Sequence, residues 1–171
     1  TDWLTPMAHY IEAFGLGEGT VRRLDEGYEL HFARDLVWKP VDDVWRVVRD
    51  PYHLPRWWPK TERVEGVNSG GWTSVLVTEK GRSVRADYRV ELSKGGERRV
   101  WSQELAGTPF EPLFNEVVFE VGLAPVSGGT EVALETRQRP RGWARFGGVM
   151  LRKAAKKQAD EALAGLAGLV E

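Results

Sequence analysis

The end of the chain holds the feature that most constrains the fold, a stretch from 142 to 170 whose pattern predicts one long amphipathic helix. Its apolar side chains recur on one helical face, namely Trp143, Phe146, Met150, Ala154, Ala162, Leu166 and Leu169. At 1.5 Å per residue this helix would be roughly 40 Å long, which is longer than any strand that the sequence predicts. A helix of this length needs an extended apolar surface to pack against.

A series of strand patterns supplies that surface. Six segments have the residue pattern of strands, near 61–68, 72–79, 82–92, 97–106, 115–124 and 130–138. Several connections between them are short and contain glycine, such as NSGG and VSGG, which is typical of hairpins. The six segments therefore predict an antiparallel meander.

One further strand and two short helices precede the meander. Residues 28–38 alternate apolar and polar side chains well enough to form a strand with one buried face. Pro40 opens a helix, Pro51 ends it, and a second short helix lies between Pro51 and Pro59. The order of one strand, two helices, six strands and one long helix predicts an α+β fold.

The first 27 residues are expected to form a separate N-terminal part, ahead of a main domain at 28–171. An apolar stripe at helical spacing, Trp3, Leu4, Met7, Ile11 and Phe14, predicts a short amphipathic helix. The run GLGEG at 15–19 then predicts a flexible joint. The helix has three possible roles, to cover a cavity mouth, to pack against the convex side of the sheet or to mediate a homodimer, and spacing does not rank them.

Charge and composition exclude several kinds of function. With 24 basic and 25 acidic residues the net charge is -1, so no global charge recruits nucleic acid. The chain has no cysteine, and no stretch approaches the ~20 apolar residues of a membrane helix. His9, His31 and His53 fall in three different segments, so we expect no metal site and no cofactor. Together with the absence of a leader pattern, these features predict a soluble, cytoplasmic protein.

The segment LVWKPVDDVWRVVRDPYHLPRWWPKTERVEG at 36–66 resembles the opening of the START and birch-pollen-allergen superfamily, often abbreviated SRPBCC. The resemblance is carried by Pro40, Trp45, Asp50, Trp57 and Pro59, and it extends through VRADYRV, GTPF and RGWARFGG over about residues 28–171. The polyketide cyclase/dehydrase and lipid-transport branch is the most similar. This resemblance implies a helix-grip fold, in which a curved seven-stranded antiparallel sheet wraps around the long C-terminal helix and leaves an apolar cavity.

Strand alternation then assigns the residues that would line such a cavity. Consecutive helical residues are about 100° apart, so we expect Trp57 to pack in the core and Trp58 to face the cavity. Gly147 and Gly148 would leave space beside the helix. The strand carboxylates Asp87, Glu104, Glu116, Glu120, Glu131 and Glu135 are expected mostly to face solvent. The candidate ligand-binding residues are Trp58, Tyr88, Trp101, Gln103, Phe114, Asn115, Val117, Phe119, Trp143, Phe146 and Met150.

Three functions agree with this sequence. The first is binding of a hydrophobic small molecule such as a lipid, polyketide or isoprenoid. The second is a cyclase, aromatase or dehydratase acting on a polyketide-like substrate, with Tyr88 as the candidate acid and Gln103 as an orienting group. The third is a protein-interaction module like the chaperone-ATPase activators of the superfamily. All three use the same architecture, so the fold does not choose among them.

Overall fold

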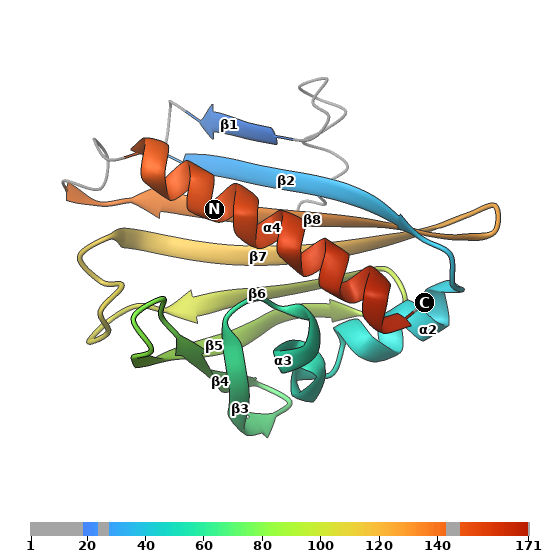
Figure 1. Ribbon diagram of the computed structural model, residues 1–171, viewed down its shortest axis with the longest axis horizontal. Coiled ribbons are helices and arrows are strands. Elements are labelled where there is room, and N and C mark those ends of the chain that lie inside the picture. Colours follow the sequence, from blue (N-terminus) through green and yellow to red (C-terminus); the bar gives the residue numbers. More distant parts are fainter. Residues whose placement is uncertain (1–18, 24–27, 143–147, 171) are drawn as a thin grey trace.

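The computed structural model describes residues 19–23, 28–142 and 148–170 (Figure 1). Its core is an eight-stranded antiparallel sheet with the strand order β1-β2-β8-β7-β6-β5-β4-β3. The strands are β1 (Gly19–Arg23), β2 (Tyr28–Val37), β3 (Thr61–Asn68), β4 (Gly71–Val77), β5 (Ser83–Lys94), β6 (Arg98–Glu104), β7 (Phe114–Val126) and β8 (Gly129–Pro140). The helices are α2 (Val41–Val48), the single 3-10 turn η1 (Pro51–His53), α3 (Leu54–Trp57) and α4 (Gly148–Val170).

This architecture confirms the predicted α+β helix-grip fold. Strands β2 to β8 are the seven predicted strands, and α2 and α3 are the two short helices that follow the first of them. Strand β1 adds an eighth strand, because residues 19–23, which the sequence suggested as part of a linker, pair with β2. The predicted N-terminal helix lies outside the described residues.

Helix α4 lies along one face of the sheet, here called the inner face, and packs against β2, β8, α2 and α3 (Figure 1). Its buried side chains are Ala155, Ala159, Ala162, Leu163 and Leu166. Met150, which the helical pattern placed on the buried face, is 81% exposed. The predicted stripe ran through Met150 and Ala154, one residue before the true stripe at Ala155, and a shift of one residue turns a side chain by about 100°.

Gly165 marks the closest approach of α4 to α3. A Cβ atom at this position would lie 2.7 Å from the carbonyl oxygen of Trp57 and 3.0 Å from its Cα atom. Both contacts are to backbone, which cannot move aside as a flexible side chain would. Gly165 therefore lets α4 approach α3 closely. Gly147 and the surroundings of Gly148, where the sequence predicted space beside the helix, lie outside the described part of the structure.

We expect Gly165→Ala to lower the free energy of unfolding by about 1–3 kcal/mol, because the added methyl group forces α4 away from α3. Gly168→Ala is the matched control in the same helix, since a Cβ atom there meets open space. It should stabilise the protein by about 0.5–1 kcal/mol through helix propensity. Urea unfolding of the two variants measures the difference, and equal effects would contradict the close contact.

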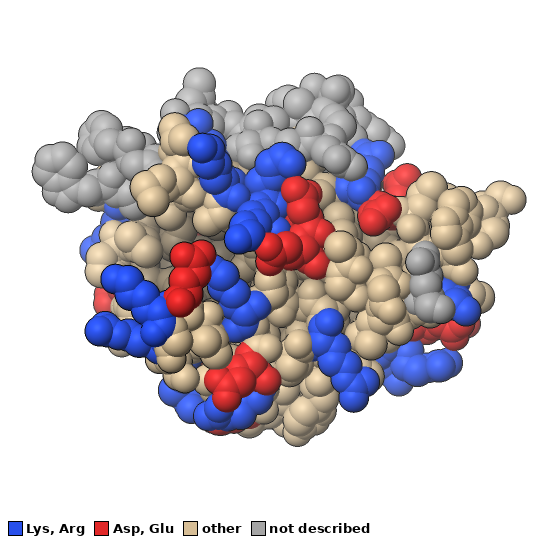
Figure 2. Space-filling model, in the orientation of Figure 1, with Lys and Arg blue, Asp and Glu red and all other residues tan. Residues whose placement is uncertain are grey.

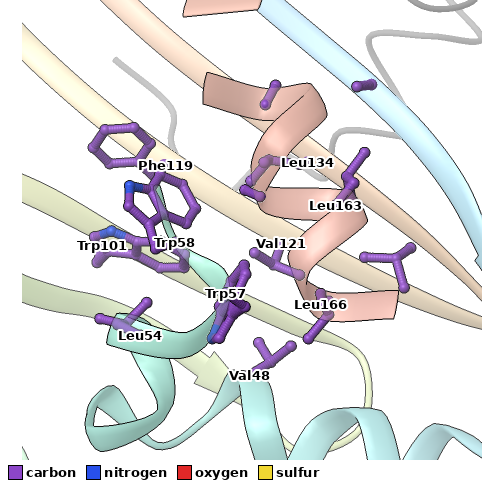
Figure 3. Close-up of a cluster of buried hydrophobic side chains, with 14 of the residues drawn as sticks. Val48, Leu54, Trp57, Trp58, Trp101, Phe119, Val121, Leu134, Leu163 and Leu166 are labelled. Atoms are coloured by element: carbon purple, nitrogen blue, oxygen red, sulfur yellow. The ribbon is translucent and has the colours of Figure 1, made fainter. Parts of the chain in front are cut away.

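The two adjacent tryptophans both lie in the core, contrary to the expectation that Trp58 faces a cavity. Helix α3 ends at Trp57, and Trp58 has extended backbone angles of φ -87° and ψ 123°. The 100° separation of helical neighbours therefore does not apply to this pair. Figure 3 shows the two indole rings meeting one another beside Trp101 and Phe119.

The outer face of the sheet, on the side away from α4, contains buried charges. Asp87 and Glu104 are exposed as predicted, but Glu120 and Glu135 are buried, which contradicts the prediction for them. Glu120 forms ion pairs with Arg98 and, at 3.6 Å, with Arg137, which lies 3.7 Å from Glu135. Strand alternation does point both carboxylates outward, but this part of the outer face is itself covered.

Glu135 should make stability depend on pH. Burial raises the pKa of its carboxyl to about 7; the Glu120 charge also raises it, while Arg137 and Arg98 lower it. In the unfolded chain a glutamate titrates near 4.3, so between about pH 4.3 and 7 the folded state binds more protons and stability falls as pH rises.

Replacing Glu135 with Gln should remove that fall. Between pH 5 and pH 8 the free energy of unfolding of the wild type should therefore drop by about 2–4 kcal/mol more than that of the variant. Urea unfolding across this range measures it. Glu131→Gln on the same strand is the control, because Glu131 is only half-buried and should keep the wild-type slope. A wild-type slope in Glu135→Gln would show that this carboxyl does not titrate as stated.

Candidate functional site

The inner face of the sheet holds an aromatic cluster, defined as Trp57, Trp58, Trp72, Tyr88, Trp101 and Phe119. Trp72 stacks on Tyr88 with ring centroids 5.3 Å apart, and Trp101 stacks on Phe119 at 5.8 Å. Trp58 meets Trp101 and Phe119 edge-on at 5.6 and 5.2 Å (Figure 3). Such pairs add about 0.5–1.5 kcal/mol each beyond area burial, so this half of the interior is a packed core.

The structure brings most of the predicted ligand-binding residues to the inner face. Trp58, Trp101, Phe114, Val117 and Phe119 are buried there, and Tyr88 and Gln103 are half-buried cross-strand neighbours. Two others do not join them. Asn115 is exposed, because the β7–β8 pairing shifts register between Phe114 and Glu116, and Met150 is exposed on α4. Trp143 and Phe146 lie outside the described residues.

A polar cluster occupies the inner face at the beginning of α4. It consists of Glu29 and His31 from β2, Thr136 and Gln138 from β8, and Arg152 from α4. Glu29 pairs with Gln138 and His31 with Thr136 across the two strands, so all four strand side chains share one face. All four are buried. Burying polar groups costs free energy unless they are satisfied, so a cluster of this kind requires a reason.

Electrostatic contacts connect the members of the polar cluster. Glu29 lies 3.5 Å from His31 Nε2 and 3.4 Å from Arg152 Nε through its two carboxylate oxygens. Burial lowers the pKa of His31 below its ordinary value of 6.5, although the Glu29 charge raises it. The imidazole is therefore neutral at pH 7, which leaves it able to accept a proton.

The strand patterns did not identify Glu29, His31 or Gln138 as site residues. The signal was present in β2, where Glu29 and His31 have the same parity as the buried Ala33 and Val37. It was hidden because Leu30 and Phe32, on the opposite parity, are apolar and also buried. Both faces of β2 are buried, so the alternation over residues 28–32 marked Leu30 and Phe32 as the buried side and gave no sign that Glu29 and His31 are buried as well.

A gap in the sheet lies next to Gln103. The β6–β7 pairing ends at Ser102 and Val118, and beyond this pair the two strands leave an open groove of about 320 Å³. Gln103, Asn115 and Val117 all line this groove. The Nε2 atom of Gln103 is buried and has no hydrogen-bond partner among the described residues. It is a donor available to an acceptor that enters from the groove.

Tyr88 keeps its proton at any physiological pH, because burial raises the pKa of its phenol. As an acid it could donate only a hydrogen bond under ordinary conditions. Within residues 19–23, 28–142 and 148–170 there is no cluster of three or more His, Asp or Glu side chains suited to a metal ion. None of the described helices is both long and apolar enough to cross a membrane.

Charges of both signs are mixed over the α4 side of the molecule (Figure 2). This distribution agrees with the net charge of -1 and gives no single-sign field on that side. The features described so far define a class of protein, a helix-grip domain with an aromatic core and a buried polar cluster between sheet and C-terminal helix. The family follows from the sequence.

The chain belongs to the family described as "Polyketide cyclase / dehydrase and lipid transport", whose model matches residues 37–171. A search of curated proteins found no match. Solved structures with the same fold include protein CV1439 from Chromobacterium violaceum, with a TM-score of 0.68 and 19% identity over 83% of this chain and 96% of that one.

Two further structures show how widely the fold is used. The di-domain ARO/CYC StfQ from the steffimycin biosynthetic pathway has a TM-score of 0.69 and 13% identity, over 84% of this chain and 51% of that one. The structure of Ara h 8.0201 has a TM-score of 0.66 and 14% identity, over 84% and 98%. At these identities the likeness concerns the fold alone.

Proposed function

We propose that the protein binds a hydrophobic small molecule that carries at least one hydrogen-bonding group, between the sheet and the N-terminal half of α4. The observation that carries this proposal is the polar cluster of Glu29, His31, Thr136, Gln138 and Arg152 on a largely apolar inner face. A lipid, a polyketide or an isoprenoid with a hydroxyl or carbonyl group has the required chemistry. Family membership supports the same class of ligand.

Two side-chain amides supply complementary hydrogen-bonding atoms. The Oε1 atom of Gln138 is a buried acceptor without a hydrogen-bond partner among the described residues, and Gln103 Nε2 is a buried donor in the same condition. Both lie on the inner face, with Val117 of β7 between their strands. A ligand hydroxyl fits Gln138, and a ligand carbonyl fits Gln103.

Apolar contact alone would give weak affinity. Burying ~300 Å² of apolar ligand surface contributes ~7 kcal/mol before several kcal/mol of association cost are subtracted. Selectivity must then come from the few polar groups. Native mass spectrometry of the purified protein tests the proposal, and we expect a retained apolar molecule or, after delipidation, a thermal shift with a panel of hydroxylated lipids and polyketides. No retained molecule and no shift would reject it.

Gln138→Met should weaken the binding of a ligand bearing a hydroxyl group by about 5- to 150-fold, because a hydrogen bond worth about 1–3 kcal/mol is lost. The same variant should bind the matching ligand without that hydroxyl almost as well as wild type. Lys153→Met on the exposed side of α4 is the control and should change neither affinity. Isothermal titration measures all three, and equal loss for both ligands would contradict a polar contact at Gln138.

A second candidate function is catalysis on the bound molecule, of the cyclase or dehydratase type. The specific observation is the neutral His31 beside the Glu29 carboxylate, an arrangement suited to a general base. Such a base would remove a proton from a carbon next to a ligand carbonyl. Tyr88 lies four strands away on β5, so it would donate a hydrogen bond only to a distant part of an extended ligand. Unchanged product profiles with His31→Gln and with Tyr88→Phe would count against these roles.

A further inference from the structure

The outer face of the sheet carries a buried strip that no described helix covers. This outer strip consists of two neighbouring cross-strand rows, Phe32, Glu135, Glu120 and Val100 in the first and Leu30, Arg137 and Val118 in the second. All seven residues are buried. Helices α2, α3 and α4 all lie on the opposite side of the sheet (Figure 1), where Val44, Leu54 and Leu163 join the inner core.

The outer strip has the dimensions of one helix. On one side the next row holds Arg34, Ala133 and Gly122, which are only half-buried, and on the other side Arg139 is exposed. The two buried rows lie about 7 Å apart along the strands; the first crosses four strands, or about 14 Å, and the second crosses three. A helix with side chains is about 10 Å wide. Burial therefore follows a band of helical width across the sheet.

The outer strip begins where the first 18 residues join the sheet. Gly19 is the first residue of β1 and pairs with Phe32, so it lies in the first buried row. The apolar stripe from Trp3 to Phe14 would be about 17 Å long as a helix, which matches the width of the outer strip. The segment therefore joins the sheet beside the outer strip. As a helix, its length suits the extent of the outer strip across the strands, and its diameter suits the spacing of the two rows along them.

We propose that residues 1–18 dock across the outer strip as an amphipathic helix, with the stripe of Trp3, Leu4, Met7, Ile11 and Phe14 against it. The apolar members of the outer strip, such as Phe32 and Val118, supply the contact surface. Its charged members pair within the sheet, Glu120 with Arg98 and Arg137, and Glu135 with Arg137. The N-terminal segment is thus neither a lid over the inner face nor a dimerisation arm.

Photo-cross-linking in the full-length chain tests this assignment. With p-benzoylphenylalanine in place of Met7, we expect intramolecular cross-links, mapped by mass spectrometry, to peptides of β2, β8, β7 or β6. The same probe in place of Glu12, on the other side of the predicted helix, should give at least fivefold fewer of these products. Cross-links from position 7 to α4, to a second copy, or to nothing would each overturn the proposal.

Thiol reactivity provides an independent test, because the native chain has no cysteine. Val118→Cys and Val121→Cys place single thiols at buried positions on opposite faces of β7. Combining each with Met7→Asp and Ile11→Asp should speed modification of the cysteine at 118 at least tenfold and leave the cysteine at 121 protected. Continued protection at 118 would overturn the proposal, as would equal exposure of both thiols, since the segment covers one face only.

Discussion

Trp58→Ala is expected to lower the free energy of unfolding by about 3–5 kcal/mol, the range for a large aromatic side chain removed from a packed core. Trp58 contacts Trp57, Trp101 and Phe119 edge-on and has 7% of its surface exposed. Its removal leaves a cavity that three rigid neighbours cannot fill. Urea unfolding followed by circular dichroism measures the loss.

Tyr52→Ala is the matched control, an aromatic residue from the same short segment with 64% of its surface exposed. It should change stability by less than about 0.5 kcal/mol. If Trp58→Ala were as mild as the control, the side chain would border empty space, as the sequence suggested, and the packed aromatic cluster would be wrong.

Glu120→Gln should also cost about 3–5 kcal/mol, because it removes the charge that faces both Arg98 and Arg137 in a buried setting. The loss comes mainly from the cations left behind. Glu104→Gln, on the exposed surface beside Arg89, should cost less than about 1 kcal/mol.

The measurement is urea unfolding at pH 8, and the double variant Glu120→Gln/Arg98→Met should recover part of the loss by removing one unbalanced cation. An additive double variant would show that the two side chains do not interact. The ion pair would then have no part in the stability of the outer face.

The sequence predicted the fold well because its signals are local. Glycine-bearing turns mark the hairpins of the meander, and proline marks the ends of α2 and α3. The family resemblance stated from Pro40, Trp45, Asp50, Trp57 and Pro59 agrees with the family match over residues 37–171. These predictions were correct because each depends on only a few neighbouring residues.

The candidate site was harder to predict because it depends on contacts between distant segments. The register shift that exposes Asn115 is set by pairing with β8, and no residue pattern within β7 predicts it. Glu120 and Glu135 follow the alternation but are buried, because a cover on the outer face does not alter a period of two. Glu29 and His31 can be recognised as members of a polar cluster only when the fold places them beside Gln138 and Arg152. Whether the predicted inner-face residues bind a ligand stays a prediction.

The tight contact at Gly165 sets how α4 can move. One end of the helix is held by backbone packing on α3, while Arg152 near the other end is joined to the sheet through an ion pair with Glu29. Tilting therefore pivots at Gly165, and over a lever of about 25 Å a rotation of 5° displaces the far end by about 2 Å. A tilt of this size would separate α4 from the sheet at the polar cluster while every strand stays hydrogen-bonded, which is the movement that the proposed ligand binding requires.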